Sequence, residues 1–285
     1  MVSVKRIAVA GASGYVGYPI SKALLGTGIF EVLVLVRSSS VGSPRIQELQ
    51  SLGAQIHGVS YTDESQLTRV LKDVDVVIST LNYSSVGDQA PLMKACVSCG
   101  VKLFFPSEFA LELASDTDSN ASKTKKEVIR IAESLRLPYV RVFNGLFPHW
   151  YITNTFFQFY PAENKVLIYG SGDEKNAWTS VEDVARFVAY ILQHVPVEQL
   201  RNQKLRIEGD RKSFNEFVVI WERKHKVKLN VSYKPISELD ERILRDPSDH
   251  EAAIGREMFS GRAAEGTAAN LLFPGWNPKS LEDAI

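Results

Sequence analysis

A glycine-rich turn near the start of the chain constrains the fold more than any other feature. Residues 5–17 are KRIAVAGASGYVG, in which an apolar run ends at Gly11 and two more glycines follow at Gly14 and Gly17. The next segment, PISKALLGTG, has the composition of a helix. A strand, a tight turn and a helix in this order are the context in which three such glycines bind a dinucleotide. A turn that is only structural is the alternative, because the glycine spacing alone is a weak signal.

Each glycine has a separate role if the turn binds a dinucleotide. Gly11 permits the tight turn, Gly14 lets the backbone approach the pyrophosphate, and Gly17 lets the helix pack closely on the strand. The phosphates then lie at the N-terminus of the helix, where free N–H groups and the helix dipole favour anions. We therefore expect the cofactor to contact the whole turn, which comprises Gly11, Ala12, Ser13, Gly14, Tyr15, Val16 and Gly17.

Apolar strands alternate with helical patterns through the first half of the chain. Strands are predicted at 31–36, 54–59, 75–79, 102–105 and 138–142, and helices at 44–52, 63–74, 86–99 and 120–135. This alternation predicts an α/β fold, a doubly wound parallel Rossmann sheet with helices on both faces. Ligands of such sheets bind outside the carboxyl ends of the strands. We therefore expect further cofactor contacts just after strands, from Thr80, Leu81, Asn82, Pro106, Ser107 and Asn144.

The pattern changes after Gly145. The segment 147–164, FPHWYITNTFFQFYPAEN, carries seven aromatic residues. This density suits a pocket wall or a subunit contact, with core packing as the alternative. The later pattern predicts a strand at 165–169, a helix at 181–192 capped by Ser180, a strand at 204–208, and a helix opened by the capping-box pair Ser213 and Glu216. We predict a dinucleotide-binding domain over 1–148, joined by 176–208, and a smaller substrate-binding lobe over 149–175 and 209–285.

The aromatic segment offers flat apolar side chains with a few polar tips. Such a surface suits a planar ligand that is oriented by few hydrogen bonds. His149 could donate one of them, although a structural histidine is the alternative. We expect substrate contacts from Phe147, His149, Trp150, Tyr151, Phe156 and Phe157.

The end of the second predicted strand indicates which nucleotide binds. Proteins that bind NAD place a carboxylate on the ribose hydroxyls, about 20 residues beyond the glycines. Here the sequence is Val36-Arg37-Ser38. A carboxylate repels a 2′-phosphate, whereas an arginine holds it through charge-assisted hydrogen bonds and stacks on the adenine. Arg37 and Ser38 therefore predict NADP(H), unless Arg37 is only a solvated charge at a strand end.

Composition argues against several other classes of partner. Basic and acidic residues balance at 33 each, so the net charge gives no sign of a nucleic-acid partner. No apolar stretch approaches the roughly 20 residues of a membrane span. The sequence runs from Met1 directly into the first strand, so we expect no targeting segment. These features predict a cytoplasmic monomer or homodimer that acts on a small molecule.

Cys96 and Cys99 close a predicted helix. A redox pair of this spacing opens a helix instead, where the dipole lowers the thiol pKa. A metal site would need ligands that no other cysteine supplies. We expect two helix cysteines buried by packing, and no metal.

Further motifs extend over nearly the whole chain. They are GASGYVG at 11–17, LVLVR at 33–37, DVVIST at 75–80, FFPSEF at 104–109, TKKEVIR at 124–130, LPY at 137–139, SFNEFVVIWE at 213–222 and FPGWNPKSLED at 273–283. With these motifs the chain resembles the NmrA-like atypical short-chain dehydrogenases. Within that group it is most similar to the isoflavone reductase and phenylcoumaran benzylic ether reductase branch.

The resemblance implies NADPH-dependent reduction of a small, usually aromatic or phenolic, molecule. It implies a Rossmann domain with a smaller C-terminal substrate lobe. It assigns Lys125 as the catalytic proton donor or base, in contact with the cofactor, and places Phe109 beside the nicotinamide and the substrate. A register slip to Lys123 or Lys126 stays open, although both are better explained as solvated helix charges.

Many short-chain dehydrogenases carry a Tyr-x-x-x-Lys motif on this helix, but Ala121 stands four residues before Lys125. The tyrosine mechanism is therefore not available from this motif. The main alternative to a reductase is an NmrA-type regulator, which binds the dinucleotide as a redox signal and performs no chemistry. An isomerase or epimerase is a third interpretation. Lys125 and the aromatic segment favour an enzyme, because a sensor needs neither.

Overall fold

The chain folds into two compact units. The computed structural model describes residues 4–82, 87–112, 120–154, 158–261 and 266–285. The first unit comprises Met1–Phe109, Thr124–Val142 and Val184–Leu205, and the second comprises Ala110–Lys123, Phe143–Asp183 and Arg206–Ile285. The chain thus returns to the first unit over a shorter stretch than the predicted 176–208. The assignment of cofactor and substrate to the two parts stays a prediction.

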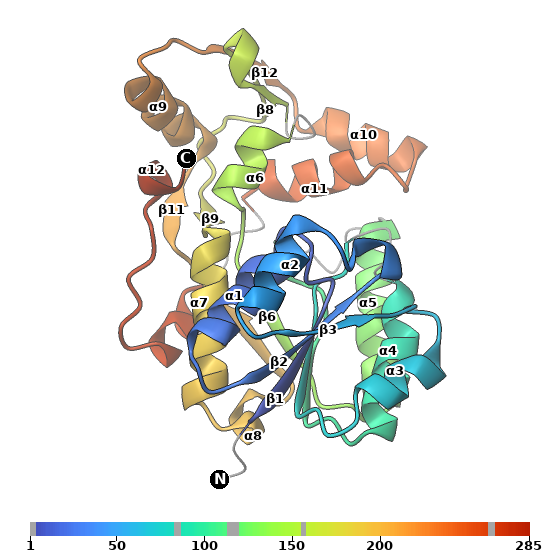
Figure 1. The fold of residues 1–285 in the computed structure, drawn as a ribbon. Coiled ribbons are helices and arrows are strands. Elements are labelled where there is room, and N and C mark those ends of the chain that lie inside the picture. Colours follow the sequence, from blue (N-terminus) through green and yellow to red (C-terminus); the bar gives the residue numbers. More distant parts are fainter. Residues whose placement is uncertain (1–3, 83–86, 113–119, 155–157, 262–265) are drawn as a thin grey trace. The chain divides into compact units, whose positions relative to one another are not determined.

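A parallel sheet forms the centre of the first unit (Figure 1). Its order is β3-β2-β1-β4-β5, and every neighbouring pair is parallel. The strands are β1 (Arg6–Ala10), β2 (Glu31–Val36), β3 (Gln55–Gly58), β4 (Val76–Ser79) and β5 (Leu103–Phe105). The strand order reverses between β1 and β4, which is the switch point where such sheets bind ligands. The predicted fold class, a doubly wound α/β fold, is confirmed.

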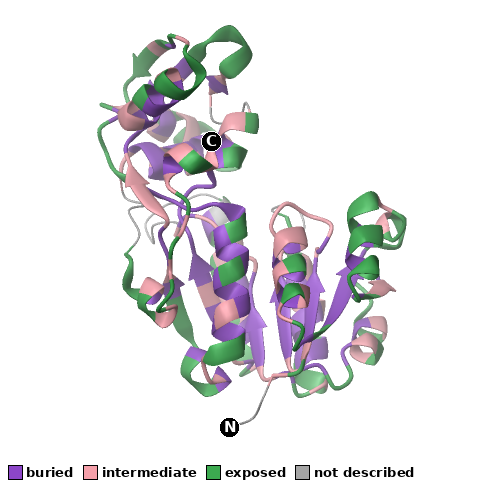
Figure 2. Cartoon of the chain, turned by 60° about the vertical axis from the view of Figure 1, so that its left-hand side comes forward, coloured by how far each residue is buried: buried purple, intermediate pink, exposed green. Residues whose placement is uncertain are grey.

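Strands β1, β2, β4 and β5 are buried on both faces (Figure 2), whereas the edge strand β3 is partly exposed. In β2, five of the six residues of EVLVLV are buried. A continuous apolar run of this kind is typical of parallel strands covered by helices on both sides. Two more strands accompany the sheet, β6 (Val140–Phe143) and β10 (Gln203–Arg206), which pair with each other.

Helices α3, α4 and α5 pack against one face of this sheet. Their apolar residues share a core cluster with β1, β2 and β4, while α1 and α2 lie on the other side (Figure 1). The helices are α1 (Gly17–Gly26), α2 (Pro44–Ser51), α3 (Glu64–Val70), α4 (Gln89–Ser98), α5 (Asn120–Ser134), α7 (Val181–His194) and α8 (Val197–Leu200), with a 3-10 turn, η1 (Ser38–Ser40). The predicted cap of α3 is confirmed, because Asp63 Oδ1 accepts from Gln66 N at 2.9 Å.

Two predictions about helix ends need correction. The predicted helix over 63–74 ends a turn early, at Val70, because Asp73 adopts a left-handed backbone conformation with φ 62°. Cys99 caps the end of α4 and is only half-buried, whereas Cys96 is fully buried. Both cysteines are free thiols, and Cys99 Sγ donates to Thr68 O at 3.2 Å.

The second unit is built from two small sheets and short helices. One sheet has the order β12-β8-β7 and the other pairs β11 with β9. The strands are β7 (Phe159–Tyr160), β8 (Lys165–Tyr169), β9 (Asn176–Trp178), β11 (Asp210–Lys212) and β12 (Asn230–Lys234). The helices are α6 (Pro148–Thr153), α9 (Phe214–His225), α10 (Ser237–Arg245), α11 (His250–Phe259) and α12 (Leu281–Ala284), with 3-10 turns η4 (Pro161–Glu163) and η5 (Ala268–Leu272).

The helix caps predicted from the sequence are formed in this unit. Ser213 Oγ accepts from Glu216 N at 3.2 Å, and Glu216 Oε2 accepts from Ser213 N at 2.7 Å, so the predicted capping box opens α9. Ser180 Oγ accepts from Asp183 N at 3.1 Å at the start of α7. Within the ranges that the structure describes, no helix has both the length and the apolar character that a bilayer crossing requires.

We expect Gly17→Ala to destabilise the first unit. A Cβ at this position would lie 2.4 Å from Thr80 Oγ1 and 2.5 Å from Gly11 O. Relieving this overlap requires the backbone to shift, so the free energy of unfolding should fall by about 1–3 kcal/mol. Gly26→Ala is the matched control, because it lies on the same helix with no atom within 4 Å of the added Cβ. Urea unfolding of both variants checks this expectation, and equal effects would contradict it.

Candidate functional site

The glycine turn between β1 and α1 forms a cradle in which side chains have no room. Gly11 has φ 81°, and a Cβ there would lie 2.9 Å from Thr80 O. A Cβ at Gly14 would lie 3.1 Å from Gly11 O. No side chain of the described residues caps the start of α1, and its first turn carries no acidic residue. The cradle and the uncapped helix start together fit the pyrophosphate of a dinucleotide.

Tyr61 supports the glycine turn. Its hydroxyl donates to Leu35 O at 2.7 Å and accepts from Gly11 N at 2.9 Å. The residue is 7% exposed, and burial raises the pKa of Tyr61 to about 12. The hydroxyl therefore stays protonated at neutral pH and keeps both hydrogen bonds. Sequence reasoning missed this residue, because its partners lie 26 and 50 positions away.

Two arginines lie near the carboxyl end of β2. Arg37 follows β2 directly and is exposed, as is its neighbour Ser38. Arg45 is the second residue of α2. Its Nη1 donates to Ser13 O at 3.2 Å, and its Cζ lies 5.3 Å from the ring centroid of Tyr18. Sequence reasoning missed Arg45. A cation in the first turn of a helix opposes the helix dipole, and this was a signal in the sequence that could have identified it.

The loop Pro106–Phe109 after β5 is held at several points. Ser107 N donates to Gln89 Oε1 at 2.9 Å, and Ser107 Oγ donates to Leu81 O at 2.7 Å. Glu108 N donates to Pro106 O at 2.8 Å. Phe109 is 5% exposed and has φ 22°, a value that a residue with a side chain rarely adopts. Strained backbone of this kind persists only where the surrounding contacts determine it, and it is frequent at functional sites.

Lys125 on α5 reaches this loop. Its Nζ donates to Glu108 O at 3.2 Å and lies 3.1 Å from Glu108 Oε2. The Lys125 side chain is 17% exposed, and that of Glu108 is 3% exposed. Arg141 on β6 holds the same carboxylate, with Nε and Nη2 at 2.9 and 2.8 Å from Glu108 Oε1. Glu108 and Arg141 were not predicted as site residues. Lys123 and Lys126, which lie on α5 with Lys125, are exposed.

The predicted site residues are divided between the two units. Those of the glycine turn, Arg37, Ser38, Thr80, Leu81, Asn82, Pro106, Ser107, Phe109 and Lys125 belong to the first unit. Thr80 Oγ1 donates to Ala10 O at 2.7 Å, beside the cradle, and Asn82 is exposed. Asn144, Phe147, His149, Trp150 and Tyr151 belong to the second unit. Phe156 and Phe157 lie outside the described residues.

The second-unit residues differ in accessibility. Asn144 is fully buried, and the part of the chain that the structure describes supplies no hydrogen-bond partner for its Oδ1. Phe147 is buried, whereas His149 and Trp150 are exposed. Tyr151 is 1% exposed and packs among Phe159, Trp178, Phe214 and Phe217, with ring centroids 4.9 to 5.7 Å apart. Core packing, the alternative given for the aromatic segment, accounts for Tyr151.

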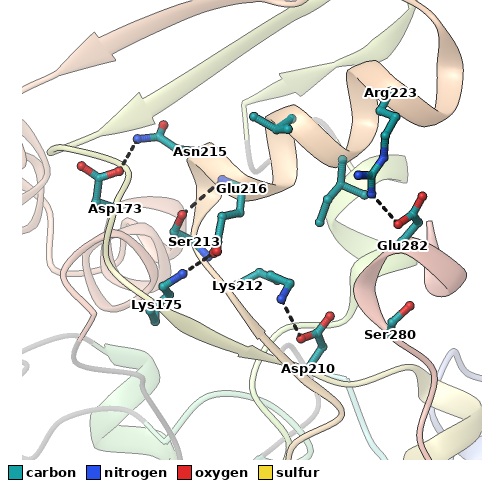
Figure 3. A pocket seen from close by; sticks show the side chains of 12 residues that line it. Asp173, Lys175, Asp210, Lys212, Ser213, Asn215, Glu216, Arg223, Ser280 and Glu282 are labelled. Carbon is teal, nitrogen blue, oxygen red and sulfur yellow. Dashed lines mark hydrogen bonds and ion pairs between the residues drawn. The ribbon is translucent and has the colours of Figure 1, made fainter.

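A hollow in the second unit carries none of the predicted site residues (Figure 3). Ion pairs line it: Lys175 with Glu216 at 2.5 Å, Lys212 with Asp210 at 3.4 Å, and Arg223 with Glu282 at 2.5 Å. Each of these cations has a carboxylate beside it, and Asp173 adds a further carboxylate to the lining, so the hollow does not favour an anionic ligand. Among the described residues, no cluster of three or more His, Cys, Asp or Glu side chains could hold a metal ion.

Comparison with known proteins places the chain in a family. The model of the NmrA-like family matches residues 3–266. A phenylcoumaran benzylic ether reductase of Pinus taeda is 32% identical over 91% of this chain and 88% of its own length. One from Betula pendula is 31% identical over 100% of this chain and 99% of its own length.

A solved structure agrees with the fold. The binary complex of leucoanthocyanidin reductase with NADPH from Vitis vinifera has a TM-score of 0.83 and 20% sequence identity, and covers 97% of each chain. The resemblance expected from the motifs is therefore confirmed over nearly the whole chain. The chain belongs to the NmrA-like family, and its curated relatives include the phenylcoumaran benzylic ether reductases.

Proposed function

We propose that this protein is an NADPH-dependent oxidoreductase that reduces a small aromatic or phenolic metabolite by hydride transfer. The observation that carries the proposal is the placement of Lys125 against the loop after β5, at the carboxyl end of the sheet. A protein that only senses a dinucleotide has no need of a half-buried lysine at this loop. The names of the relatives, which are reductases, support the same conclusion.

The first unit has the residues to hold the cofactor. The cradle of Gly11, Gly14 and Gly17 would receive the pyrophosphate, with the uncapped start of α1 facing it. Arg37 would hold the 2′-phosphate, and Arg45, anchored on Ser13 O, would add a second guanidinium. When bound, the reduced cofactor supplies the hydride.

Lys125 would exchange the proton that accompanies hydride transfer. Reduction of a carbonyl, an enone or a benzylic ether requires a proton at the substrate oxygen or carbon, or removal of one from a phenol. Lys125 Nζ is a proton-carrying group beside the Pro106–Phe109 loop, and general acid–base catalysis by such a group contributes about 10²–10⁴ in rate. For the substrate we propose contacts with Phe109, Phe147, His149 and Trp150, and we assign Tyr151 to the core because of its burial.

Arg37→Ala should weaken NADPH binding much more than NADH binding. Loss of a charge-assisted hydrogen bond to the 2′-phosphate costs about 1.5–3 kcal/mol, or roughly 10- to 150-fold in the dissociation constant. Arg69→Ala, which removes another exposed arginine of the first unit, should change neither constant. Titration of both cofactors by fluorescence measures the effect. Equal affinities for NADPH and NADH in the unmodified protein would refute the assignment.

Tyr61→Phe should reduce stability and make it less dependent on pH above about 10. The folded-state pKa of about 12 lies above the unfolded value near 10. The folded state therefore binds more protons in this window, and its advantage declines as pH rises, by about 1.4 kcal/mol per pH unit. Urea unfolding at pH 8 and pH 11 should show the gap between wild type and variant narrowing. A constant gap would mean that Tyr61 is not the group that titrates.

Lys125→Ala should remove most turnover and change NADPH affinity little. The loss should be about 10²–10⁴-fold in kcat, because the proton-exchanging group is gone while the cradle and Arg37 remain. Lys125→Arg should not restore turnover, because arginine stays protonated at neutral pH. NADPH oxidation is followed with aromatic ketones, enones and benzylic ethers as substrates.

Lys126→Ala is the matched control, since Lys126 is the exposed neighbour on the same helix and should retain full turnover. Wild-type turnover in Lys125→Ala would remove Lys125 from the mechanism. An unmodified protein that binds NADPH but oxidises it with none of these substrates would favour the regulator instead.

A further inference from the structure

A buried carboxylate between two cations distinguishes the loop after β5. Glu108 is 3% exposed at its side chain, and its two oxygens face different partners. Arg141 Nε and Nη2 both contact Glu108 Oε1, at distances of 2.9 and 2.8 Å. Lys125 Nζ lies on Oε2 at 3.1 Å. The guanidinium therefore holds Oε1, and the other oxygen, Oε2, lies beside the lysine.

Glu108 holds Lys125 through its backbone as well as its side chain. Lys125 Nζ donates a hydrogen bond to Glu108 O at 3.2 Å and forms an ion pair with Glu108 Oε2 at 3.1 Å, so one residue contacts the same ammonium twice. A lysine side chain has four torsions, and it loses much of its rotamer freedom when a hydrogen bond and an ion pair hold its ammonium group. The amine is thus directed by Glu108 rather than by α5 alone.

The loop that carries Glu108 cannot easily follow a displaced lysine. Ser107 is bonded at its amide to Gln89 and at its hydroxyl to Leu81 O. Phe109, the next residue after Glu108, is buried with φ 22°. A residue fixed on both sides in this way provides the rigid support that a catalytic group requires.

We propose that Glu108 is the positioning residue of Lys125, and that Arg141 acts through Glu108 by orienting its carboxylate. This proposal rests on the proposed function of Lys125. Removing the negative charge leaves two half-buried cations without the carboxylate between them, and the two cations repel each other. Lys125 Nζ then moves away from its position at the loop. A misplacement of about 1 Å in a reacting group is enough to slow catalysis roughly 100-fold.

Glu108→Gln tests the carboxylate with little change in shape. We expect kcat to fall roughly 10- to 100-fold, while the dissociation constant of NADPH stays within about twofold. Arg141→Lys keeps the positive charge but loses the planar fork, and should give a smaller fall in kcat with the same unchanged cofactor binding. This second variant leaves the Glu108–Lys125 pair in place, so it keeps the proposal testable if Glu108→Gln does not fold.

Asp75→Asn is the matched control for a lost ion pair. Asp75 pairs with Lys102 and accepts from Lys5 N and Arg6 N, at the end of the sheet where β1 begins. Its loss should lower the melting temperature and leave kcat unchanged. If Glu108→Gln behaves like Asp75→Asn, with lower stability and normal kcat, Glu108 is a structural residue and the proposal is overturned.

A second measurement needs neither cofactor nor turnover. An acetylating reagent needs access to the amine, so Lys125 of the cofactor-free protein should react slowly while Glu108 holds its Nζ against the loop. Its acetylation rate, relative to that of exposed Lys126 in the same peptide, should rise roughly fivefold in Glu108→Gln. Mass spectrometry resolves the two sites. An unchanged ratio would overturn the positioning role.

The two measurements separate this inference from the function on which it rests. Wild-type turnover in Lys125→Ala would refute the catalytic role of Lys125, whatever Glu108 does. The acetylation ratio would still decide whether Glu108 holds Lys125. Where Lys125→Ala has lost turnover, a fall in kcat of Glu108→Gln together with a raised acetylation ratio supports the positioning role, and a normal value of either contradicts it.

Discussion

The close contact of three backbone segments at the glycine turn is the constraint on which the first unit depends. Gly11 and Gly17 lie against Thr80 at the end of β4, at distances that leave no room for a Cβ. β1 and β4 are neighbours in the sheet, with Ala10 in register with Ser79. The turn, the start of α1 and the end of β4 therefore share one small volume. This volume lies where the strand order reverses, so the same contact packs the turn after β1 against the end of β4 and shapes the candidate cofactor site.

Much of the fold could be predicted from the sequence because local patterns and tertiary structure agree. The apolar runs that became β1, β2 and β4 are buried on both faces, and the capping residues Asp63 and Ser213 open the helices that they predict. The errors arise where a long-range contact or a backbone conformation decides. Asp73 ends α3 early by turning left-handed. Tyr151 lies in the core because Phe214 and Phe217, more than sixty positions later, surround it.

The candidate site was predictable only in part for the same reason. Motifs with fixed local spacing predicted the glycine turn and Arg37, and the resemblance to the family predicted Lys125. The residues that support them have no such spacing. Glu108 contacts Lys125 across 17 positions and Arg141 across 33, and Tyr61 reaches Gly11 across 50. Buried ionic and hydroxyl partners of this kind become visible only when β5, α5 and β6 are placed in three dimensions.

The hydroxyl of Tyr61 gives the glycine turn its shape before any ligand arrives. A loop that becomes ordered on binding loses about 1–2 kcal/mol of backbone conformational entropy per residue. Gly11 loses little of this entropy on binding, because its amide N–H already donates to Tyr61 Oη and to Leu35 O. A binding site that is already ordered can release an oxidised dinucleotide and bind a reduced one without refolding. If the turn binds the cofactor as proposed, cofactor exchange requires no rearrangement of its backbone.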